Sequence, residues 1–512
     1  MIKLVHQHSE KIVAIYKDGK QIEGYADEVV ITAFWAIASD YPDQWICWIE
    51  ERQIDNFDEA TFFEIFHHKL IMASCAVETS FFNEDIGYVD QFPFVAVNRS
   101  VNYPTWLMSS DIGAIHANAL LKFKRSVSIF SNFDYLLNAI AKLGQQNGLF
   151  CYHSPNLAIK RNQNITYKAS EADLFSFTFQ FYKKIRAVIL FLCFIQYKKK
   201  YYLQSFIFNC FKRNFFSIDI DFSDIAIESS KPCIDNAVDV IIPTIGRPKH
   251  LLNVLKDLKK QTLLPHKVIV VEQNPDVGSK TDFTFIAEDW PFEIKHIFTH
   301  QTGACNARNM ALKEVTESWV FFCDDDNKFD TNLLKDTFLI IKKYGVQVLL
   351  TSYRTKNESL LYKNAKQWGT FGAGNAIVKS STIANIQFDR SLEHGYGEDT
   401  DFGMQLRNKG VDIIYHPDVE IIHLKAPMGG FRTKIIKAWE QVKLIPKPSP
   451  TVMIYIQKNY TLEQRRGYKL ILWLKFYKSQ KIKNPFKYKR LMQKRWEESE
   501  RWAAKLQQNR EG

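Results

Sequence analysis

The chain has 512 residues, of which 46% are hydrophobic and 14% aromatic, and its formal net charge is +11. This length predicts two to four domains, and the apolar content is ample for packed cores. The eight cysteines are scattered without a CxxC pair, which argues against a zinc site or a disulfide framework and favours a reducing cytosol. The first twenty residues lack a long apolar region, so we expect no signal peptide.

Residues 1–165 are expected to form an α/β domain without a metal cluster or a phosphate-binding loop. Parts of it parallel later parts of the chain in the same order. Residues 45–51 parallel 319–325, and residues 138–157 parallel 405–419. The alternative is chance similarity between amphipathic α/β segments.

Residues 166–232 are expected to form an amphipathic helical and linker region. Its apolar part, residues 185–195, lies between basic residues at 183–186 and 198–200. The apolar part is far shorter than the ~20 residues that span a bilayer. We therefore expect a buried or interfacial helix, followed by a linker over residues 219–231.

The next segment predicts the start of a parallel α/β sheet. Residues 238–243 and 267–271 are apolar runs typical of buried strands, and residues 251–263 have helical spacing between them. Ligands of such sheets bind outside the carboxyl ends of the strands. Arg247 follows the first run and Glu272 follows the second, so both are expected at that edge.

A third apolar run, residues 319–322, ends in Asp324, Asp325 and Asp326. Carboxylates clustered at the end of a buried strand indicate a hard divalent cation, which takes carboxylate and phosphate oxygens as ligands. The alternative is an Asp-rich turn that caps the next helix. Just upstream, Arg308 has the charge to serve a diphosphate, or it is a surface arginine.

Acidic residues also begin a predicted helix at Glu398, Asp399 and Asp401. Acids in the first turn of a helix complement its dipole, but three acids in four residues exceed what capping needs. Gly395 and Gly397 precede them and allow the backbone to approach a ligand closely.

Two strand-like runs, residues 411–416 and 419–422, follow this helix, and His423 ends the second. A histidine at a strand end, in a chain with an Asp cluster, is a candidate metal ligand. Trp368, Gly374 and Asn375 belong to a loop that we interpret as facing a sugar. The alternative places Trp368 in the core.

Taken in order, these pieces resemble a family 2 glycosyltransferase of the GT-A fold. The resemblance covers residues 237–430, about 40% of the chain. The matching pieces are residues 241–244, 270–274, 303–312, 324–326 and 397–401. The resemblance implies a nucleotide-sugar donor, a divalent metal ion and inversion at the anomeric carbon.

The resemblance also implies a role for each matching residue. The expected donor-nucleotide residues are Thr244, Arg247, Glu272, Asn274, Arg308, Asp324 and Asp325. The expected ligands of Mn²⁺ or Mg²⁺ are Asp324, Asp326 and His423. Asp399 matches the catalytic base, and Glu398 is its rival or a contact for acceptor hydroxyls. Glu272 stands where many members have Asp, which puts the identity of the nucleobase in doubt.

The basic residues concentrate at the end of the chain. Residues 432–512 hold 21 Lys and Arg against 6 Glu. The difference, +15, exceeds the net charge of +11 of the whole chain. With the aromatic and leucine residues among them, residues 446–512 fit an interfacial helix on an anionic membrane. The alternative is a helical tail packed on the catalytic domain. Without a base-reading motif we expect no nucleic-acid partner.

We therefore expect an α/β protein with four segments. Residues 1–165 form an N-terminal domain, a cut-down GT-A-like repeat without the strand–helix–strand that ends at Glu272. Residues 166–232 form the linker region, 233–430 the GT-A domain and 431–512 a basic helical extension.

The predicted function is an inverting, metal-dependent glycosyltransferase of cell-surface polysaccharide synthesis. It transfers sugar from a nucleotide-sugar donor to a glycan or lipid-linked acceptor on the cytoplasmic face of the membrane. The alternatives are a non-catalytic GT-A scaffold or glycan-binding protein, and a sugar nucleotidyltransferase.

Overall fold

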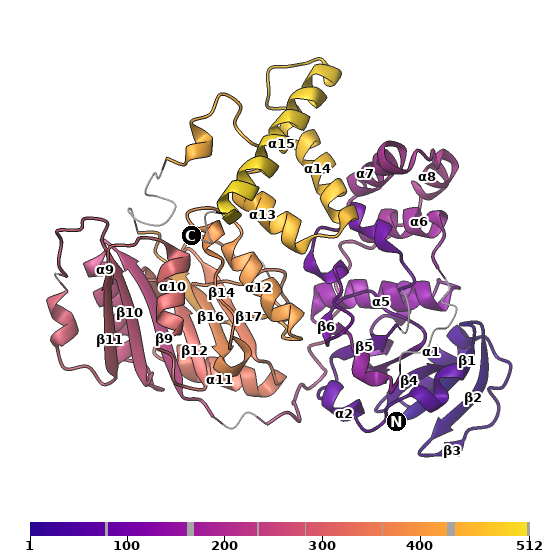
Figure 1. Ribbon diagram of the computed structural model, residues 1–512. Coiled ribbons are helices and arrows are strands. Elements are labelled where there is room, and N and C mark those ends of the chain that lie inside the picture. Colours follow the sequence, from indigo (N-terminus) through magenta and orange to yellow (C-terminus); the bar gives the residue numbers. More distant parts are fainter. Residues whose placement is uncertain are drawn as a thin grey trace. The chain divides into compact units, whose positions relative to one another are not determined.

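The computed structural model describes residues 1–76, 80–160, 168–232, 235–281, 283–360, 362–426 and 436–508. The chain forms two compact units (Figure 1). Unit 1 consists of Met1–Lys231 and Tyr460–Ile471, and unit 2 of Pro232–Asn459 and Leu472–Gly512. The boundaries of these units differ from those of the four segments expected above, because residues 460–471 belong to unit 1.

Unit 2 is built on a mixed sheet with the strand order β11-β10-β9-β12-β16-β14-β17-β13. Strands β11, β10, β9 and β12 are parallel to one another, and β16 is antiparallel to both β12 and β14. The strands are β9 Val238–Ile245, β10 Lys267–Gln273, β11 Glu293–Thr299, β12 Trp319–Cys323, β13 Asn327–Phe329, β14 Val348–Arg354, β15 Lys366–Gln367, β16 Asn375–Lys379 and β17 Ile414–His423.

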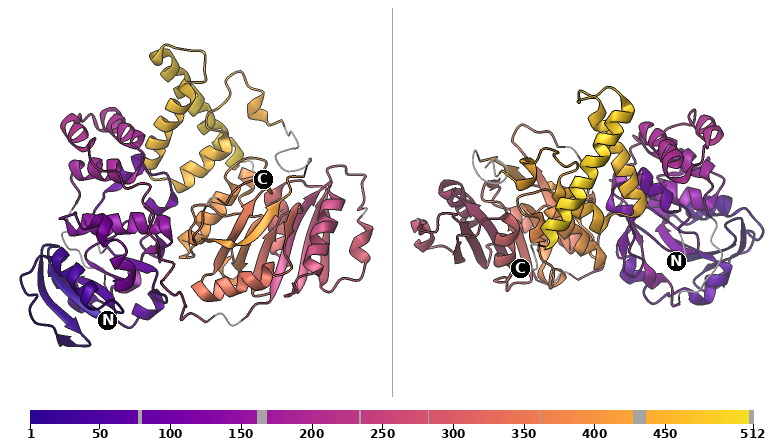
Figure 2. Two further views of the ribbon diagram at one scale, coloured as in Figure 1. Left: turned by 180° about the vertical axis from the view of Figure 1, so that it is seen from behind. Right: turned by 45° about the horizontal axis from the view of Figure 1, so that its top comes forward.

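Helices cover both faces of this sheet (Figure 2). They are α9 Pro248–Lys259, α10 Ala304–Leu312, α11 Leu333–Tyr344 and α12 Glu398–Asn408. Apolar residues of α10 and α12 share a core with strand residues such as Ile241, Val320 and Phe322. Because α10 and α12 pack on one face, their amino-terminal ends reach the edge where β9, β10 and β12 end.

One element differs from its prediction. The runs at residues 411–416 and 419–422 were expected as separate strands, but residues 414–416 and 419–422 belong to the single strand β17, which begins only at Ile414. Its parallel pairing with β14 shifts register between Thr351 and Ser352. Pro417 lacks the N–H that a regular ladder needs, so the strand passes it with an irregularity instead of ending.

Unit 1 has a sheet with the order β3-β2-β1-β4-β7-β5-β8-β6. Its strands are β1 Ile2–Gln7, β2 Lys11–Lys17, β3 Lys20–Gln21, β4 Trp45–Glu50, β5 Ile71–Cys75, β6 Tyr103–Pro104, β7 Ile112–His116 and β8 Phe150–His153. Its helices are α1 Val30–Asp40, α2 Phe62–Ile65, α3 Ala117–Leu121, α4 Lys124–Val127, α5 Phe133–Asn147, α6 Glu171–Phe181, α7 Ile185–Cys193 and α8 Leu203–Asn209.

The two sheets share their pairing scheme. Strand β1 is parallel to β4, β4 and β5 are antiparallel to β7, and β5 is parallel to β8. The same relations join β9, β12, β16, β14 and β17 of unit 2. The difference follows the first strand: β1 turns back into the antiparallel β2, whereas β9 leads through α9 to the parallel β10. The two sheets therefore share these pairing relations, and among the described residues β1 is followed by no counterpart of the strand–helix–strand from β9 to β10.

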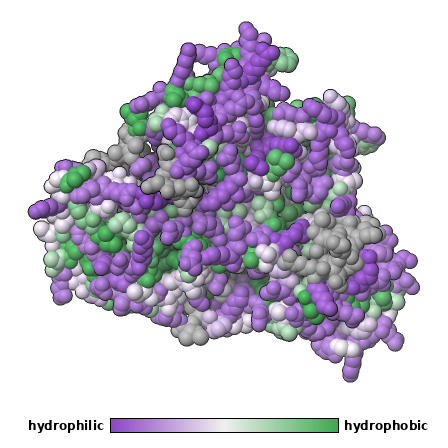
Figure 3. All heavy atoms as spheres, viewed as in Figure 1, coloured by the Kyte–Doolittle hydropathy of each residue, from purple (hydrophilic) through white to green (hydrophobic). Residues whose placement is uncertain are grey.

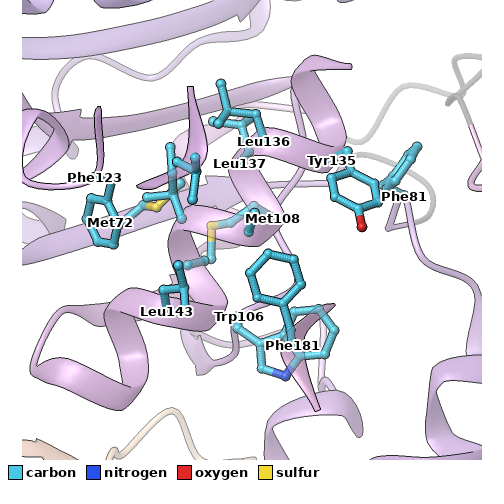
Figure 4. Packing of buried hydrophobic residues seen from close by; sticks show 14 of the residues in the cluster. Met72, Phe81, Trp106, Met108, Phe123, Tyr135, Leu136, Leu137, Leu143 and Phe181 are labelled. Atoms are coloured by element: carbon cyan, nitrogen blue, oxygen red, sulfur yellow. The ribbon is translucent and has the colours of Figure 1, made fainter. Parts of the chain in front are cut away.

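The core of unit 1 is rich in aromatic residues (Figure 4). Trp106 stacks on Phe177 of α6 with ring centroids 5.2 Å apart, and Phe181 stacks on Phe215 at 5.5 Å. The segment expected as a linker region therefore contributes α6 and later residues to this core. Phe222 and Ile225 are also buried in it.

The C-terminal extension is helical, as expected, with α13 Pro450–Asn459, α14 Leu462–Tyr477 and α15 Pro485–Gln508. Within unit 2, α15 packs on α13, and the Ser499 hydroxyl donates to the Pro448 carbonyl at 2.7 Å. No helix in the described part of the chain has the length and apolar character needed to cross a bilayer.

Candidate active site

The polar residues that follow β9 and β12 meet at one edge of the unit 2 sheet. The Thr244 hydroxyl, from the end of β9, donates to Asp325 Oδ2 at 2.6 Å. Arg247 lies beyond the same strand and places a guanidinium nitrogen 2.9 Å from Asp325 Oδ1 and 3.3 Å from Asp326 Oδ2. Adjacent parallel strands bring their carboxyl ends together, which is why residues about 80 positions apart form one cluster.

The last two carboxylates of the triplet are buried but have different environments. Burial raises the pKa of Asp325 to about 7, against the opposing effects of Arg247 and the Thr244 hydroxyl. Burial also opposes ionisation of Asp326, but hydrogen bonds from His423 and from the amide of Ala426 outweigh it and lower its pKa. Asp326 is therefore the carboxylate held ionised.

The first carboxylate, Asp324, is the more exposed one, with 29% of its side chain accessible. Its Oδ1 lies 3.3 Å from Arg308 of α10. Arg308 reaches a second acid with its other nitrogen, which lies 3.9 Å from Asp399 Oδ1. The charges of Asp399, Asp324 and Glu398 raise the pKa of Arg308 despite its burial, so the arginine bridges the triplet and the start of α12 as a fixed cation.

Glu398 and Asp399 are the first two residues of α12. Asp399 Oδ2 accepts a hydrogen bond from the amide of Ala373 at 3.2 Å. Partial burial raises the pKa of Asp399, and burial together with the charge of Asp399 raises that of Glu398 to about 7. A carboxylate with a raised pKa, fixed by an amide and still 35% accessible, is suited to accept a proton.

The expected metal ligands lie close together in part. His423 Nε2 is 3.4 Å from Asp326 Oδ1, and β13 pairs its Asn327 with His423. Asp324 follows β12 two residues earlier in the chain and contacts Arg308 instead. Two carboxylates and an imidazole are donors that Mn²⁺ and Mg²⁺ accept, and the lowered pKa of Asp326 keeps one of them charged, so the residues fit such an ion.

A different group could also hold a metal ion. Within the described ranges, Asp239, His266 and Glu317 bring their ligand atoms within 4.8 Å of one another. Asp239 is the second residue of β9, at the opposite end of that strand from Thr244. It accepts hydrogen bonds from the amides of Thr316 and Glu317, so this group connects β9 to the entry of β12, away from the candidate active site.

The two remaining residues expected to bind the donor nucleotide, Glu272 and Asn274, lie at the end of β10. Glu272 is buried, and its Oε2 accepts from the Thr281 hydroxyl at 2.6 Å and lies 2.9 Å from His296 Nε2 on β11. The amide of Asn274 donates to Thr299, and its carbonyl lies 3.0 Å from His300 Nδ1. Thus Glu272 contacts the loop after β10 and the strand β11, while Arg247 and Arg308 contact the Asp triplet.

The acceptor candidates occupy different surroundings. Trp368 packs its ring against Tyr362 and Tyr415, with centroids 5.1 Å and 5.0 Å away. Asn375 donates to the carbonyl of Thr351 at 2.8 Å. Gly374 lies directly at the cluster, because a Cβ there would come within 2.2 Å of Asp324 Oδ2. Of the three, Gly374 is the one in contact with the charged cluster.

Two residues of the cluster were not expected from the sequence. The Tyr353 hydroxyl, near the end of β14, lies 3.0 Å from Asp324 Oδ2, and its ring stacks on His423. Glu393 accepts from the amides of Cys305 and Asn306 and fills the amino-terminal end of α10 beside Gly303. A polar residue ending the apolar run of β14 was the available signal for Tyr353; nothing local marks Glu393.

The part of the chain that carries this site is similar to known glycosyltransferases. Residues 239–402 match the model of "Glycosyl transferase family 2". Poly(ribitol-phosphate) beta-N-acetylglucosaminyltransferase TarS of Staphylococcus aureus strain Mu50 is 29% identical over 125 residues, covering 23% of this chain and 21% of TarS. YwdF of Bacillus subtilis strain 168, an uncharacterized glycosyltransferase, is 28% identical over 93 residues, covering 18% of this chain and 33% of YwdF.

The chain thus spans about a fifth to a third of the length of these curated relatives. A crystal structure of S. aureus TarS 1-349 in complex with UDP-GlcNAc aligns with a TM-score of 0.33 and 20% identity, covering 46% of this chain and 70% of that one. The family match includes β9, β10, the Asp triplet and the start of α12, and both curated relatives are named glycosyltransferases. The predicted resemblance to family 2 glycosyltransferases is confirmed over residues 239–402.

Proposed function

We propose that this chain is an inverting glycosyltransferase that moves a sugar from a nucleotide-diphosphate donor to a hydroxyl of a glycan or lipid-linked acceptor. The observation that carries the proposal is the bridge from Asp399 through Arg308 to Asp324. Arg308 is the fixed cation in this bridge. It connects Asp399, the proposed proton acceptor, to the accessible carboxylate of Asp324 at the edge where β9, β10 and β12 end. The curated relatives support sugar transfer as the reaction, and the name of TarS, a poly(ribitol-phosphate) beta-N-acetylglucosaminyltransferase, supports a polymer as the acceptor.

The reaction we propose needs one displacement. The acceptor oxygen bonds to the anomeric carbon while the bond from that carbon to the diphosphate oxygen breaks, which inverts the centre. The acceptor proton passes to Asp399, a transfer that contributes about 10²–10⁴-fold in rate. Ala373 holds Asp399 by its amide, so the carboxylate is oriented before the acceptor arrives.

The reaction also requires that the negative charge that develops on the leaving diphosphate is stabilised. Arg308 and Arg247 are cations at this edge, and their side chains are only 10% and 11% exposed. We propose that Asp324, Asp326 and His423 hold Mn²⁺ or Mg²⁺; such an ion, when bound, supplies Lewis-acid stabilisation of the diphosphate. Thr244 and Arg247 hold Asp325 in place, and Glu272 lies on the nucleoside side at the end of β10.

A donor screen tests the proposal. Release of free nucleotide would be measured with UDP-, GDP- and dTDP-sugars, with Mn²⁺ or Mg²⁺ and with EDTA. We expect one donor to be hydrolysed slowly in a metal-dependent way, and Asp399→Asn to stop that release. Failure of every donor to bind, measured by calorimetry, would favour a non-catalytic scaffold.

The charge of the basic extension supports a membrane surface as the location of this reaction. No Asp or Glu occurs from residue 464 to 496, and Lys481, Lys483 and Lys487 are exposed. We propose that this part of residues 446–512 contacts anionic lipid on the cytoplasmic face of the membrane. Replacing the three lysines by Gln should lower binding to anionic vesicles. Deleting the whole segment is a poor test, because Thr451 and Met453 are buried in unit 2.

A further inference from the structure

A second basic segment lies in unit 1, around α7 and α8. Residues 174–218 contain no Asp or Glu. Their cations are Lys183, Lys184, Arg186, Lys198, Lys199, Lys200, Lys212 and Arg213. In the structure α6, α7 and α8 group together, and the last five of these cations lie just before and just after α8 (Figure 1). An all-cationic segment of this kind favours an anionic partner.

Helix α8 has an inner face that packs and an outer face that does not. Phe206 packs against Phe179 of α6 and Phe191 of α7, with ring centroids 5.3 Å and 5.1 Å apart. Asn209 is buried beside it and donates to the carbonyl of Ser205 at 2.7 Å. The helix is therefore anchored to unit 1 through one side, which fixes the direction of the other.

The outer face is apolar. Leu203 and Ile207 are one helical step of four residues apart, and Phe211 continues the series because Cys210 keeps right-handed helical angles. Phe208 and Phe211 are 73% and 86% exposed, and hydrophobic atoms are visible at the edge of the molecule over α8 in Figure 3. Large apolar side chains gathered in water mark an interaction surface rather than a core.

The cations flank this apolar face in the sequence and do not interrupt it. Lys199 and Lys200 lie just before α8, and Lys212 and Arg213 follow Phe211 directly. An exposed aromatic centre with lysine and arginine at its margin matches the interfacial region of an anionic bilayer, where rings enter the headgroup layer and cations contact phosphate. A second copy of this chain is a poor occupant, because a two-fold contact would oppose the same cations to each other.

We infer that the outer face of α8, formed by Leu203, Ile207, Phe208 and Phe211, docks on an anionic lipid surface together with Lys199, Lys200, Lys212 and Arg213. This contact is separate from the C-terminal lysines and does not depend on catalysis. It makes unit 1 a membrane-contacting module of its own.

Co-sedimentation of the full chain with vesicles tests the inference. The vesicles are phosphatidylcholine alone, or phosphatidylcholine with about a third phosphatidylglycerol. The test variant is Phe208→Ser with Phe211→Ser. The matched control is Phe63→Ser with Phe92→Ser, since these phenylalanines are also in unit 1 and are 63% and 61% exposed. We expect the wild type to bind the anionic vesicles, the test variant to lose about tenfold in partitioning, and the control to lose none.

A charge variant, Lys199→Gln with Arg213→Gln, should also weaken binding while leaving the aromatic face intact. Unchanged melting temperature shows that each variant is folded, as expected for exposed positions. The inference is overturned if the Phe208 and Phe211 variant sediments like the wild type, or if zwitterionic vesicles bind equally well. It is also overturned if light scattering shows a wild-type dimer that this variant abolishes, because a second copy then occupies the face.

Discussion

The two sheets carry a carboxylate at the same place, yet their surroundings differ. Asp134 is the second residue of α5, as Asp399 is of α12. Asp134 accepts from the amide of Ser110, two residues before β7, and Asp399 accepts from the amide of Ala373, two residues before β16. Since β7 and β16 have the same pairing partners in the two sheets, the acid corresponding to the proposed base persists in unit 1.

What surrounds the two acids separates them. The β1–β2 turn has positive φ at His8 and Ser9 and brings the Ser9 hydroxyl to 2.9 Å from Asp134, whose residue is 1% exposed. In unit 2 the chain continues from β9 to Arg247 and α9 instead of turning back, and Asp399 has an arginine beside it. In the proposed function, the strand–helix–strand from β9 to β10, which the described part of unit 1 lacks, thus distinguishes the two units more than the carboxylate does.

The largest expected effect separates the two acids directly. Asp399→Asn should lower the rate of sugar transfer by about 10²–10⁴-fold, because the acceptor proton loses its base. Asp134→Asn should leave the rate within about twofold, since Ser9 and Ser110 enclose that acid away from substrate. Initial rates with the identified donor measure both. A large loss from Asp134→Asn would contradict a closed site in unit 1.

The next comparison concerns Asp326, which follows β12, and Glu50, which ends β4. Asp326→Ala should lower metal-dependent turnover by about 10²-fold, because His423 and Arg247 lose their shared carboxylate partner. Glu50 ends β4 and pairs with Arg52 at 2.8 Å, so Glu50→Ala is the matched control in unit 1. The control should keep its turnover and its response to EDTA. Equal losses in both variants would mean a general effect on folding.

The pH dependence of turnover comes third. Burial and the charge of Asp399 raise the pKa of Glu398 to about 7, and burial raises the pKa of Asp399. A base must be ionised to accept a proton, so kcat should fall by about tenfold per pH unit below the governing pKa. Glu398→Gln removes the neighbouring charge and should shift the profile to lower pH. A profile that stays flat from pH 5 to 8, a range that includes the pKa of about 7, would exclude Glu398 as the base.

Sequence reasoning reached the β9–β10 and β12 strands and the Asp triplet because apolar runs ending in polar residues are local signals. It did not find Glu393 at the start of α10, since that contact joins residues almost 90 positions apart. It also missed Asp134, although it noticed the repeat. Helix α5 has 15 residues and α12 has 11, so an extra turn displaces the acids from each other in a sequence comparison.

The smallest effect tests whether Asp134 is held as the structure has it. Burial raises its pKa to about 6, above the ordinary value of 3.8. The folded state then binds more protons than the unfolded state between these values, so the free energy of unfolding decreases as pH rises through this range. Asp134→Asn should remove that decrease and gain up to about 3 kcal/mol relative to the wild type at pH 7.

Denaturant melts at pH 4 and pH 7 measure this difference, and the outcome separates two accounts of unit 1. If Asp134→Asn melts like the wild type at both pH values, the carboxylate is hydrated and its site is open, as in unit 2. If the variant gains stability only at the higher pH, the acid is enclosed. Unit 1, over the residues that the structure describes, also lacks the strand–helix–strand that would hold a donor. The second result would therefore leave binding or packing as the role of unit 1.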